Sequence, residues 1–159
     1  MSEIFRLRYI RGNEARDIKG IETEFGFPWS SFWIGSDELF RFSMLAFYNP
    51  INFDIIGLAQ IKSFTKEGIE DYRSEGRPYM LDKTISIDYF EVSKRYRGQG
   101  YGTEMFNKIR SIYKNRRFIL DSTQTAEHFW LANGFKFYDE SRVTTSRLIY
   151  DNGNGIIED

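Results

Sequence analysis

The 159-residue sequence predicts a single domain of mixed α/β (α+β) class. Segments with the two-residue alternation of strands recur along the chain, segments with helical spacing lie between them, and no linker or internal repeat divides it. A strand–helix–strand unit at 84–121 implies at least one parallel pair of strands. We place the domain at 1–150 and expect residues 151–159 to form a frayed tail.

The first third of the chain predicts one strand, one short helix and an irregular segment. Apolar and charged residues alternate over 4–10, which predicts the strand. Asn13 is a suitable N-cap for a short helix with isoleucines on one face. Residues 25–40 are rich in aromatics, and Pro28 and Gly35 interrupt any long helix there.

The middle of the chain predicts an antiparallel hairpin and a further strand. Alternation returns at 41–48, an Asn-Pro pair then marks a turn, and residues 54–64 form the returning strand. Residues 65–78 are charged and polar, which indicates a loop or a short helix. The segment TISIDYFEV at 84–92 is rich in β-branched and aromatic residues and is therefore a strand.

Two helices and three strands are expected in the last third. Apolar residues at i, i+1, i+4, i+7 and i+8, counted from Met105, predict an amphipathic helix. Thr123 or Thr125 is a suitable cap for the second helix, and Gly134 stands where a C′ glycine belongs. The elements after the first of these helices are a strand at 117–121, a helix at 126–133, and strands at 135–139 and 144–150.

The composition excludes several kinds of chemistry. With no cysteine and with His128 as its only histidine, the chain has no disulfide, no Cys-ligated or multi-histidine metal site and no cysteine nucleophile. A site for magnesium or calcium built from carboxylates and backbone oxygens stays open, but we name no metal. The net charge of −1 argues against a nucleic-acid partner. With no apolar span and no secretory signal, we expect a cytoplasmic protein without a membrane partner.

The most informative segment is RGQGYGT at 97–103, which leaves a predicted strand and opens a predicted helix. The first backbone N–H groups of a helix have no partner within it, and glycines let a backbone approach an anion closely. The segment therefore predicts a phosphate or pyrophosphate cradle, with Thr103 adding a hydroxyl and Lys94, Arg95 and Arg97 adding charge. A plain glycine-rich turn is the alternative. Neither a Walker loop nor a complete dinucleotide fingerprint matches.

Three features together resemble the GNAT superfamily of N-acetyltransferases. The Gln/Arg-x-x-Gly-x-Gly/Ala motif of that family, which binds acetyl-coenzyme A (acetyl-CoA), is matched by Arg97, Gly100 and Gly102. The segment IIGLAQI at 55–61 is similar to the family's third strand, and the resemblance covers about residues 54–138. A later element of the family is matched by Ala126, Trp130, Gly134 and Phe135.

The resemblance implies a central mixed, mostly antiparallel sheet, flanked by helices, in which one parallel strand pair is splayed around the cofactor. It implies transfer of acetyl from acetyl-CoA, as co-substrate, to a primary amine by direct attack in a ternary complex. The pantetheine arm would pair with the strand before the loop, and a backbone N–H near Val92 would stabilise the oxyanion. The implied cofactor-binding residues are Phe90, Glu91, Val92, Arg97, Gly98, Gln99, Gly100, Tyr101, Gly102, Thr103 and Trp130.

The candidates for the base are Glu91, Asp88 and Asp121, which lie at or near strand ends. The alternative for each is a solvated carboxylate or a salt bridge to Arg95, Arg97 or Lys94, and a relayed water is a further alternative.

The acid is a separate question. Trp130 stands where many family members carry tyrosine, and an indole does not ionise usefully. Tyr101, Tyr89 and Tyr138 are possible substitutes. His128, two helical residues from Trp130, should face the opposite way.

The acceptor is a small-molecule or peptide amine of unknown identity, and a homodimer stays open. Two alternatives also stay open: a non-catalytic CoA-binding module that has lost the acid, or another phosphate- or nucleotide-binding protein that uses the same loop. Aromatic and acidic residues of the N-terminal segment would line the acceptor site, or serve as core and charged surface. They are Phe25, Phe27, Trp29, Phe32 and Trp33, with Glu22, Glu24, Asp37 and Glu38.

Overall fold

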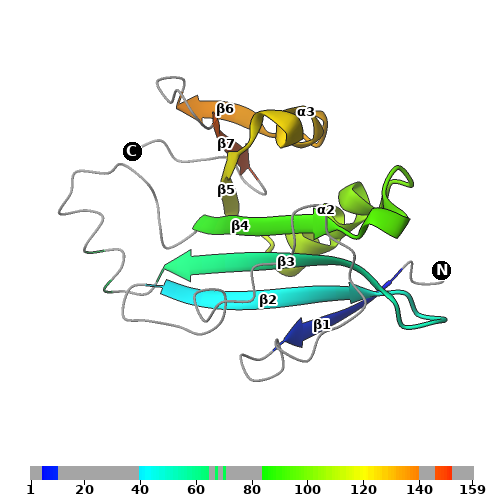
Figure 1. Ribbon diagram of the computed structural model, residues 1–159. Helices are drawn as coiled ribbons and strands as arrows, with labels where there is room; N and C mark the ends of the chain where they lie inside the picture. The colour runs from blue at the N-terminus through cyan, green and yellow to red at the C-terminus, as the bar shows by residue number, and fades with distance from the viewer. Residues whose placement is uncertain are drawn as a thin grey trace.

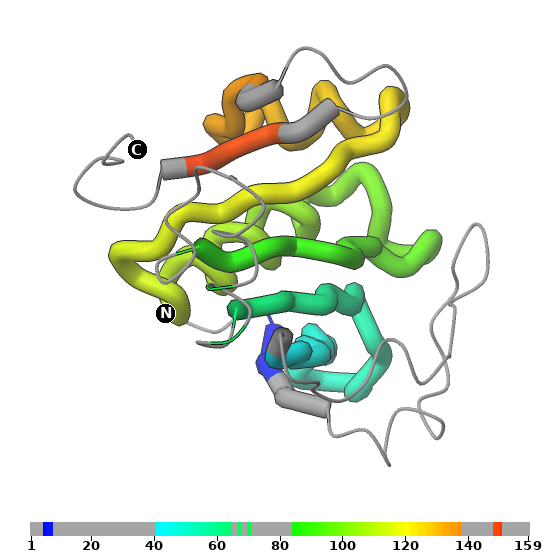
Figure 2. The backbone as a smooth tube through the Cα atoms, turned by 90° about the vertical axis from the view of Figure 1, so that its left-hand side faces the viewer, coloured from blue at the N-terminus to red at the C-terminus, as the bar shows by residue number. Residues whose placement is uncertain are grey.

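A computed structural model of the chain describes residues 5–10, 40–64, 67, 70, 84–139 and 146–151. The strands in this part form one seven-stranded sheet in the order β1-β2-β3-β4-β5-β7-β6, and Figure 2 shows them side by side. The strands are β1 (Arg6–Ile10), β2 (Phe40–Tyr48), β3 (Ile55–Phe64), β4 (Thr84–Val92), β5 (Arg117–Ser122), β6 (Lys136–Asp139) and β7 (Ser146–Asp151). The helices are η4 (Lys94–Tyr96, a 3-10 turn), α2 (Tyr101–Ile112) and α3 (Gln124–Ala132).

Every strand predicted from the sequence is present, with bounds that differ by a residue or two. The β2–β3 hairpin is antiparallel, and its turn contains the predicted Asn-Pro pair. The helix expected after Asn13 lies outside the described residues. Of the segment at 65–78, the structure describes only Glu67 and Glu70, and both are helical. No helix in the described part of the chain is both long and apolar enough to cross a membrane.

The sheet is mixed, as predicted. Neighbouring strands are antiparallel except for β4 and β5, which run parallel. Residues 44–47 of β2 are all buried, so this strand is covered on both faces rather than on one. Asn133 and Gly134 end α3: Gly134 has φ +98°, and the N–H of Phe135 bonds back to the carbonyl of Trp130 at 3.1 Å. Gly134 is therefore the predicted C′ glycine.

Helices α2 and α3 pack on the same side of the sheet and share one core. Met105, Phe106 and Ile109 of α2 are buried, as the amphipathic spacing predicts. The Phe106 ring lies 5.7 Å from that of Phe118 and 5.9 Å from that of Trp130, so both helices meet the sheet in one aromatic cluster. This side of the sheet is called the helix face below, and the opposite side the far face.

Strands β4 and β5 begin together and then part. Their parallel register covers only Thr84 to Ser86 of β4, against Arg117 to Ile119 of β5. Beyond Ser86, β4 pairs with β3 alone up to Val92. Figure 1 shows β4 running across the view while β5 rises away from it. The splayed parallel pair that the resemblance implied is therefore present in the sheet.

A β-bulge lies where the two strands part. Gln60 of β3 pairs with Tyr89 and Ile61 pairs with Ile87, so Asp88 is an extra residue in β4. The bulge places Asp88 and Tyr89 together on the far face, whereas Phe90 joins the core cluster on the helix face. The far face of β4 consequently carries Ser86, Asp88, Tyr89 and Glu91.

Candidate functional site

The segment after β4 forms an open loop that leads into a helix N-terminus. Gly98 and Gly100 have φ of +75° and +84°, a backbone conformation that favours glycine. A Cβ added at either glycine would meet nothing within 4 Å, so the space above the loop is open. Gly100 is the N-cap of α2, and no side chain caps the first turn. The loop therefore has the shape and exposed N–H groups of an anion cradle.

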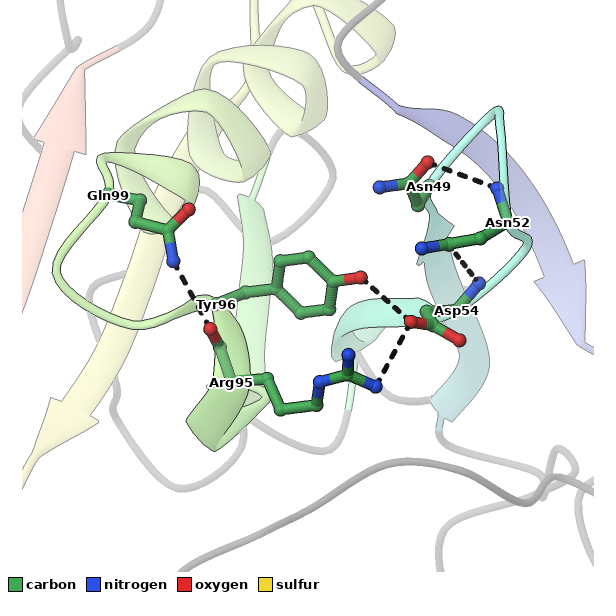
Figure 3. A network of polar contacts seen from close by, with 6 residues as sticks. All are labelled: Asn49, Asn52, Asp54, Arg95, Tyr96 and Gln99. Atoms are coloured by element: carbon green, nitrogen blue, oxygen red, sulfur yellow. Dashed lines mark hydrogen bonds and ion pairs between the residues drawn. The ribbon is translucent and has the colours of Figure 1, made fainter.

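The loop is anchored to the β2–β3 turn through Asp54. One oxygen of this carboxylate, Oδ2, accepts hydrogen bonds from Tyr96 Oη at 2.9 Å and from Arg95 Nη1 at 3.2 Å (Figure 3). The turn that carries Asp54 is itself braced, because Asn52 Oδ1 accepts from the Asp54 N–H at 2.9 Å. On the other side, Gln99 donates to the Arg95 carbonyl at 3.1 Å. These bonds fix the start of the loop relative to the sheet.

The basic side chains before the glycines have different surroundings. Arg95 pairs with Asp54, and Arg97 turns back to β4, where it donates to the Val92 carbonyl at 2.9 Å and to Glu91 Oε1 at 2.8 Å. The Lys94 side chain is exposed and forms no ion pair within the described part of the chain. Two of the three charges expected to assist the cradle are thus engaged in holding the loop.

Two glycines allow close packing around α2. A Cβ at Gly57 would lie 2.4 Å from Met105 Sδ and 2.8 Å from the Glu91 carbonyl oxygen, so α2 packs directly on the β3 backbone there. A Cβ at Gly102 would lie 3.0 Å from the Phe129 ring, which brings the start of α2 close to α3. Gly102, predicted to bind the cofactor, therefore also has a packing role.

The three candidate bases lie on the far face, on both strands of the splayed pair. Asp88 accepts from Ser86 Oγ at 2.5 Å and faces Lys62 Nζ at 3.5 Å. Glu91 accepts from Tyr89 Oη and pairs with Arg97. Asp121 is exposed on β5, two residues beyond Ile119, the last residue paired with β4. The pair of Glu91 with Arg97 is one of the salt bridges in the alternative interpretation, whereas the Lys62 partner of Asp88 was not predicted.

Tyr89 is the tyrosine of the candidate site with a perturbed ionisation. Burial raises the pKa of its hydroxyl above the ordinary value, and the hydrogen bond to Glu91 and the charge of that carboxylate raise the pKa further. The charge of Arg97 acts in the opposite direction. The phenol therefore stays protonated throughout the neutral range.

The other aromatic candidates lie apart from the far face. Trp130 is only 5% exposed and packs edge-on against Phe90 at 4.9 Å, inside the aromatic cluster. Tyr101 packs edge-on against Tyr96 at 5.6 Å. His128 is exposed on α3 while Trp130 is buried, so the two face different ways, as predicted. The side chain of Tyr138, and the aromatic and acidic residues named between 22 and 38, lie outside the described residues.

Sequence reasoning missed Asp54, Lys62 and Ser86. Asp54 is far from its loop partners in the sequence, and no local pattern marks it. Lys62 faces Asp88 because β3 pairs with β4, which no spacing reveals, whereas Ser86 shares a face with Asp88 through the two-residue alternation of the strand. The position of Asp54, a carboxylate at the start of the predicted strand, was the only sequence signal for its role in anchoring the loop.

Comparison with known proteins agrees with this geometry. The chain matches the sequence model of the Acetyltransferase (GNAT) family over residues 13–135. No curated protein matches it. Among solved structures, it is similar to the GNAT domain of S. lividans PAT, with 15% identity, TM-score 0.64, and coverage of 92% of this chain and 90% of that chain.

Two further structures show the same fold along nearly the whole chain. PaiA N-acetyltransferase from Thermoplasma acidophilum, solved in complex with coenzyme A, has 12% identity and TM-score 0.59 over 95% of this chain and 99% of that chain. Nourseothricin acetyltransferase has 13% identity and TM-score 0.57 over 94% and 99%. The family match spans most of the sequence, and this protein therefore belongs to the GNAT acetyltransferase family, a family of acyltransferases.

Proposed function

We propose that this protein is an N-acetyltransferase that transfers acetyl from acetyl-CoA to a primary amine by direct attack in a ternary complex. The observation that carries the proposal is the continuity of two features. The strand edge of β4 that opens beyond Ser86 leads straight into the open glycine loop. An extended slot that ends in an anion cradle suits a ligand with an amide-containing arm and a pyrophosphate.

The loop would hold the pyrophosphate. Backbone N–H groups between Gly98 and Thr103 lie at the N-terminus of α2, where the helix dipole favours negative charge. The Thr103 hydroxyl and the exposed Lys94 ammonium are further donors. Arg97 would act mainly by holding Glu91 and Val92 in place.

The edge of β4 around Phe90 to Val92 would hold the pantetheine arm. The amides of the pantetheine arm alternate donors and acceptors as a peptide does, so the arm can pair with a strand edge that lacks a neighbouring strand. Phe90 is fixed from the helix face by Phe129 and Trp130, at ring distances of 5.7 and 4.9 Å. The co-substrate supplies the thioester and the thiol leaving group, and this cysteine-free chain supplies no nucleophile.

The reaction also needs a hydrogen-bond donor for the oxyanion and an acceptor for the amine proton, and both would come from groups at the same edge of β4. A backbone N–H near Val92 would donate to the oxyanion. Asp88, Glu91 and Asp121 are the candidate proton acceptors, with a relayed water as the alternative. A GNAT relative solved with coenzyme A, and another whose name is nourseothricin acetyltransferase, support the cofactor class and an amine acceptor.

One observation favours a second function, a CoA-binding module without catalysis. Trp130 occupies the position at which many relatives carry tyrosine, and it is packed in the core rather than offered to a leaving group. Under this reading the cradle and the slot bind CoA, and no acetyl group is transferred.

Thermal unfolding with acetyl-CoA, CoA and ATP, followed by a panel of amines, tests these functions. We expect stabilisation by both coenzyme A species and not by ATP, and release of free thiol with at least one amine. The chain has no cysteine, so a thiol reagent reads the product without background. Stabilisation by ATP alone would contradict the proposal. Tight CoA binding with no turnover of any amine would favour the non-catalytic module.

A further inference from the structure

The ionisable groups of β4 all lie on one of its two faces. Asp88, Tyr89 and Glu91 stand on the far face, whereas on the helix face Phe90 is covered by Phe129 and Trp130. An acceptor amine at the slot would therefore meet proton-accepting groups of β4 from the far face. On the helix face, the described neighbours of Phe90 are the apolar rings of Phe129 and Trp130.

Glu91 is held at both carboxylate oxygens. Oε2 accepts from the Tyr89 hydroxyl, and Oε1 accepts from Arg97 Nη2 at 2.8 Å, with only 15% of the side chain exposed. Arg97 is itself oriented by its second bond, from Nε to the Val92 carbonyl at 2.9 Å. The result is a fixed line of three side chains, from the guanidinium through the carboxylate to the phenol.

Within this line the phenol is the group that can accept a proton at its oxygen while it passes its own proton to a neighbour. Arg97 has donors and no acceptor, and the two oxygens of Glu91 are already engaged. Around Tyr89, the charged groups on the far face of β3 and β4 are Lys62, Asp88 and Glu91, with Arg97 from the loop. The two polar side chains next to each other on β4 have different partners. The Asp88 carboxylate faces the Lys62 ammonium, whereas the Tyr89 hydroxyl faces the Glu91 carboxylate.

We propose that Tyr89 and Glu91 form a proton relay that serves the acetyl transfer, with Arg97 as its positioning residue. The inference rests on the proposed function. As the nitrogen of a neutral amine bonds to the acetyl carbon and the C–S bond breaks, the amine proton passes to Tyr89 Oη and the phenol proton passes to Glu91 Oε2. The thiolate then takes the proton of Tyr89, and Glu91 returns its own to the phenol.

The cycle balances with one proton moved from nitrogen to sulfur. One pair of side chains thus acts first as base and then as acid. This removes the need for a tyrosine at the position of Trp130, since the same proton is delivered from β4. The raised pKa of Tyr89 keeps the phenol protonated at neutral pH, so transfer through it requires that one proton leaves Oη as another arrives.

Tyr89→Phe and Glu91→Gln test the relay in the full-length protein. Both substitutions keep the size of the side chain. We expect each to lower kcat on the order of 100-fold, the usual scale of general acid–base catalysis, while the Kd for CoA stays within about twofold. The double variant should be no slower than the slower single variant, since both remove one relay. Tyr113→Phe, a hydroxyl loss at the far end of α2, is the matched control.

A second readout uses the protein without ligand. Alkaline titration of tyrosine absorbance should show a late-ionising component that Tyr89→Phe removes and that Glu91→Gln shifts to lower pH. An unshifted titration in Glu91→Gln, additive kinetic losses, or full activity of Tyr89→Phe would each overturn the relay alone. A wild-type protein that binds CoA and acetylates no amine would overturn the proposed function and the relay together.

Discussion

The two ends of β4 differ in how they are held. Its first residues pair with β3 and β5 at once, and Ile85 there is 2% exposed in the core. Its last residues pair with β3 alone and lead into the glycine loop, which is anchored through Asp54 rather than through the sheet. One strand thus changes from a structural element to a candidate binding element at the point where its second neighbour departs.

We expect contributions to stability and to binding to be separable along this strand. Substitutions in the doubly paired end should change the free energy of unfolding and leave ligand affinity unchanged. Substitutions in the glycine loop that follows the singly paired end should do the reverse. Four variants test this distinction, and they are given in order of decreasing effect.

Ile85→Ala should have the largest effect, and on stability alone. Truncating a buried isoleucine in a packed core costs about 2–5 kcal/mol of the free energy of unfolding. Urea denaturation measures the loss, and calorimetry at a temperature where the variant is folded should give an unchanged Kd for CoA. A folded Ile85→Ala protein that no longer binds CoA would show that the two ends are not separable.

Gly100→Glu should act on binding. Gly100 has φ +84° at the N-cap of α2, so glutamate there strains the backbone and places a negative charge in the anion cradle. We expect the Kd for CoA to rise at least on the order of 100-fold, equivalent to about 2.7 kcal/mol. Ser111→Glu adds the same charge at the exposed end of α2 and should leave the Kd unchanged. An equal Kd for CoA in the two variants would contradict the proposed anion cradle.

Asp54→Ala should have a smaller effect on binding through the position of the loop. It removes the acceptor of the bonds from Arg95 and Tyr96, each of the kind that contributes about 1 kcal/mol. We expect the Kd for CoA to rise about fivefold, measured by calorimetry. Asn52→Ala removes a bond within the same turn without touching the loop. Its Kd should match that of the wild type, and a rise equal to that of Asp54→Ala would trace the effect to the turn.

The smallest effect concerns alkaline pH. The pKa of Tyr89 is raised by folding, so above pH 10 the unfolded chain loses this proton while the folded chain keeps it. The stability that Tyr89 contributes below pH 10 is therefore lost as the pH rises further. The free energy of unfolding of the wild type should fall more steeply with pH above pH 10 than that of Tyr89→Phe. The difference between the two slopes corresponds to at most about one bound proton. Parallel slopes in denaturation at several pH values would contradict the shift.

Much of the fold follows from local sequence. The alternation at 84–92, the helical spacing from Met105 and the C′ position of Gly134 each depend on neighbours within one or two turns, and each was predicted correctly. The family motif located the glycine loop for the same reason. Residue roles in cofactor binding and catalysis remain predictions, which the experiments above address.

The rest depends on contacts that no local pattern records. Strict alternation along 84–92 puts Tyr89 with Ile85 and puts Phe90 with Ser86, whereas the bulge at Asp88 reverses both placements. The bulge is defined by the register against β3, which a single strand does not reveal. The same holds for Arg97, expected to face the cradle, because its partners lie on β4.

The bulge also bears on how such a site can arise. Asp88 has no counterpart on β3, and without it β4 would keep Ile87 and Phe90 on the helix face and Tyr89 and Glu91 on the far face. Compared with a β4 from which Asp88 is deleted, the bulged strand therefore keeps the same side chains on the same faces and differs in an extra residue that bends the strand where β5 leaves it. For the evolution of the site, insertion of one codon in β4 is a route to the bent strand beside the open slot, and its deletion is a route back to a regular strand.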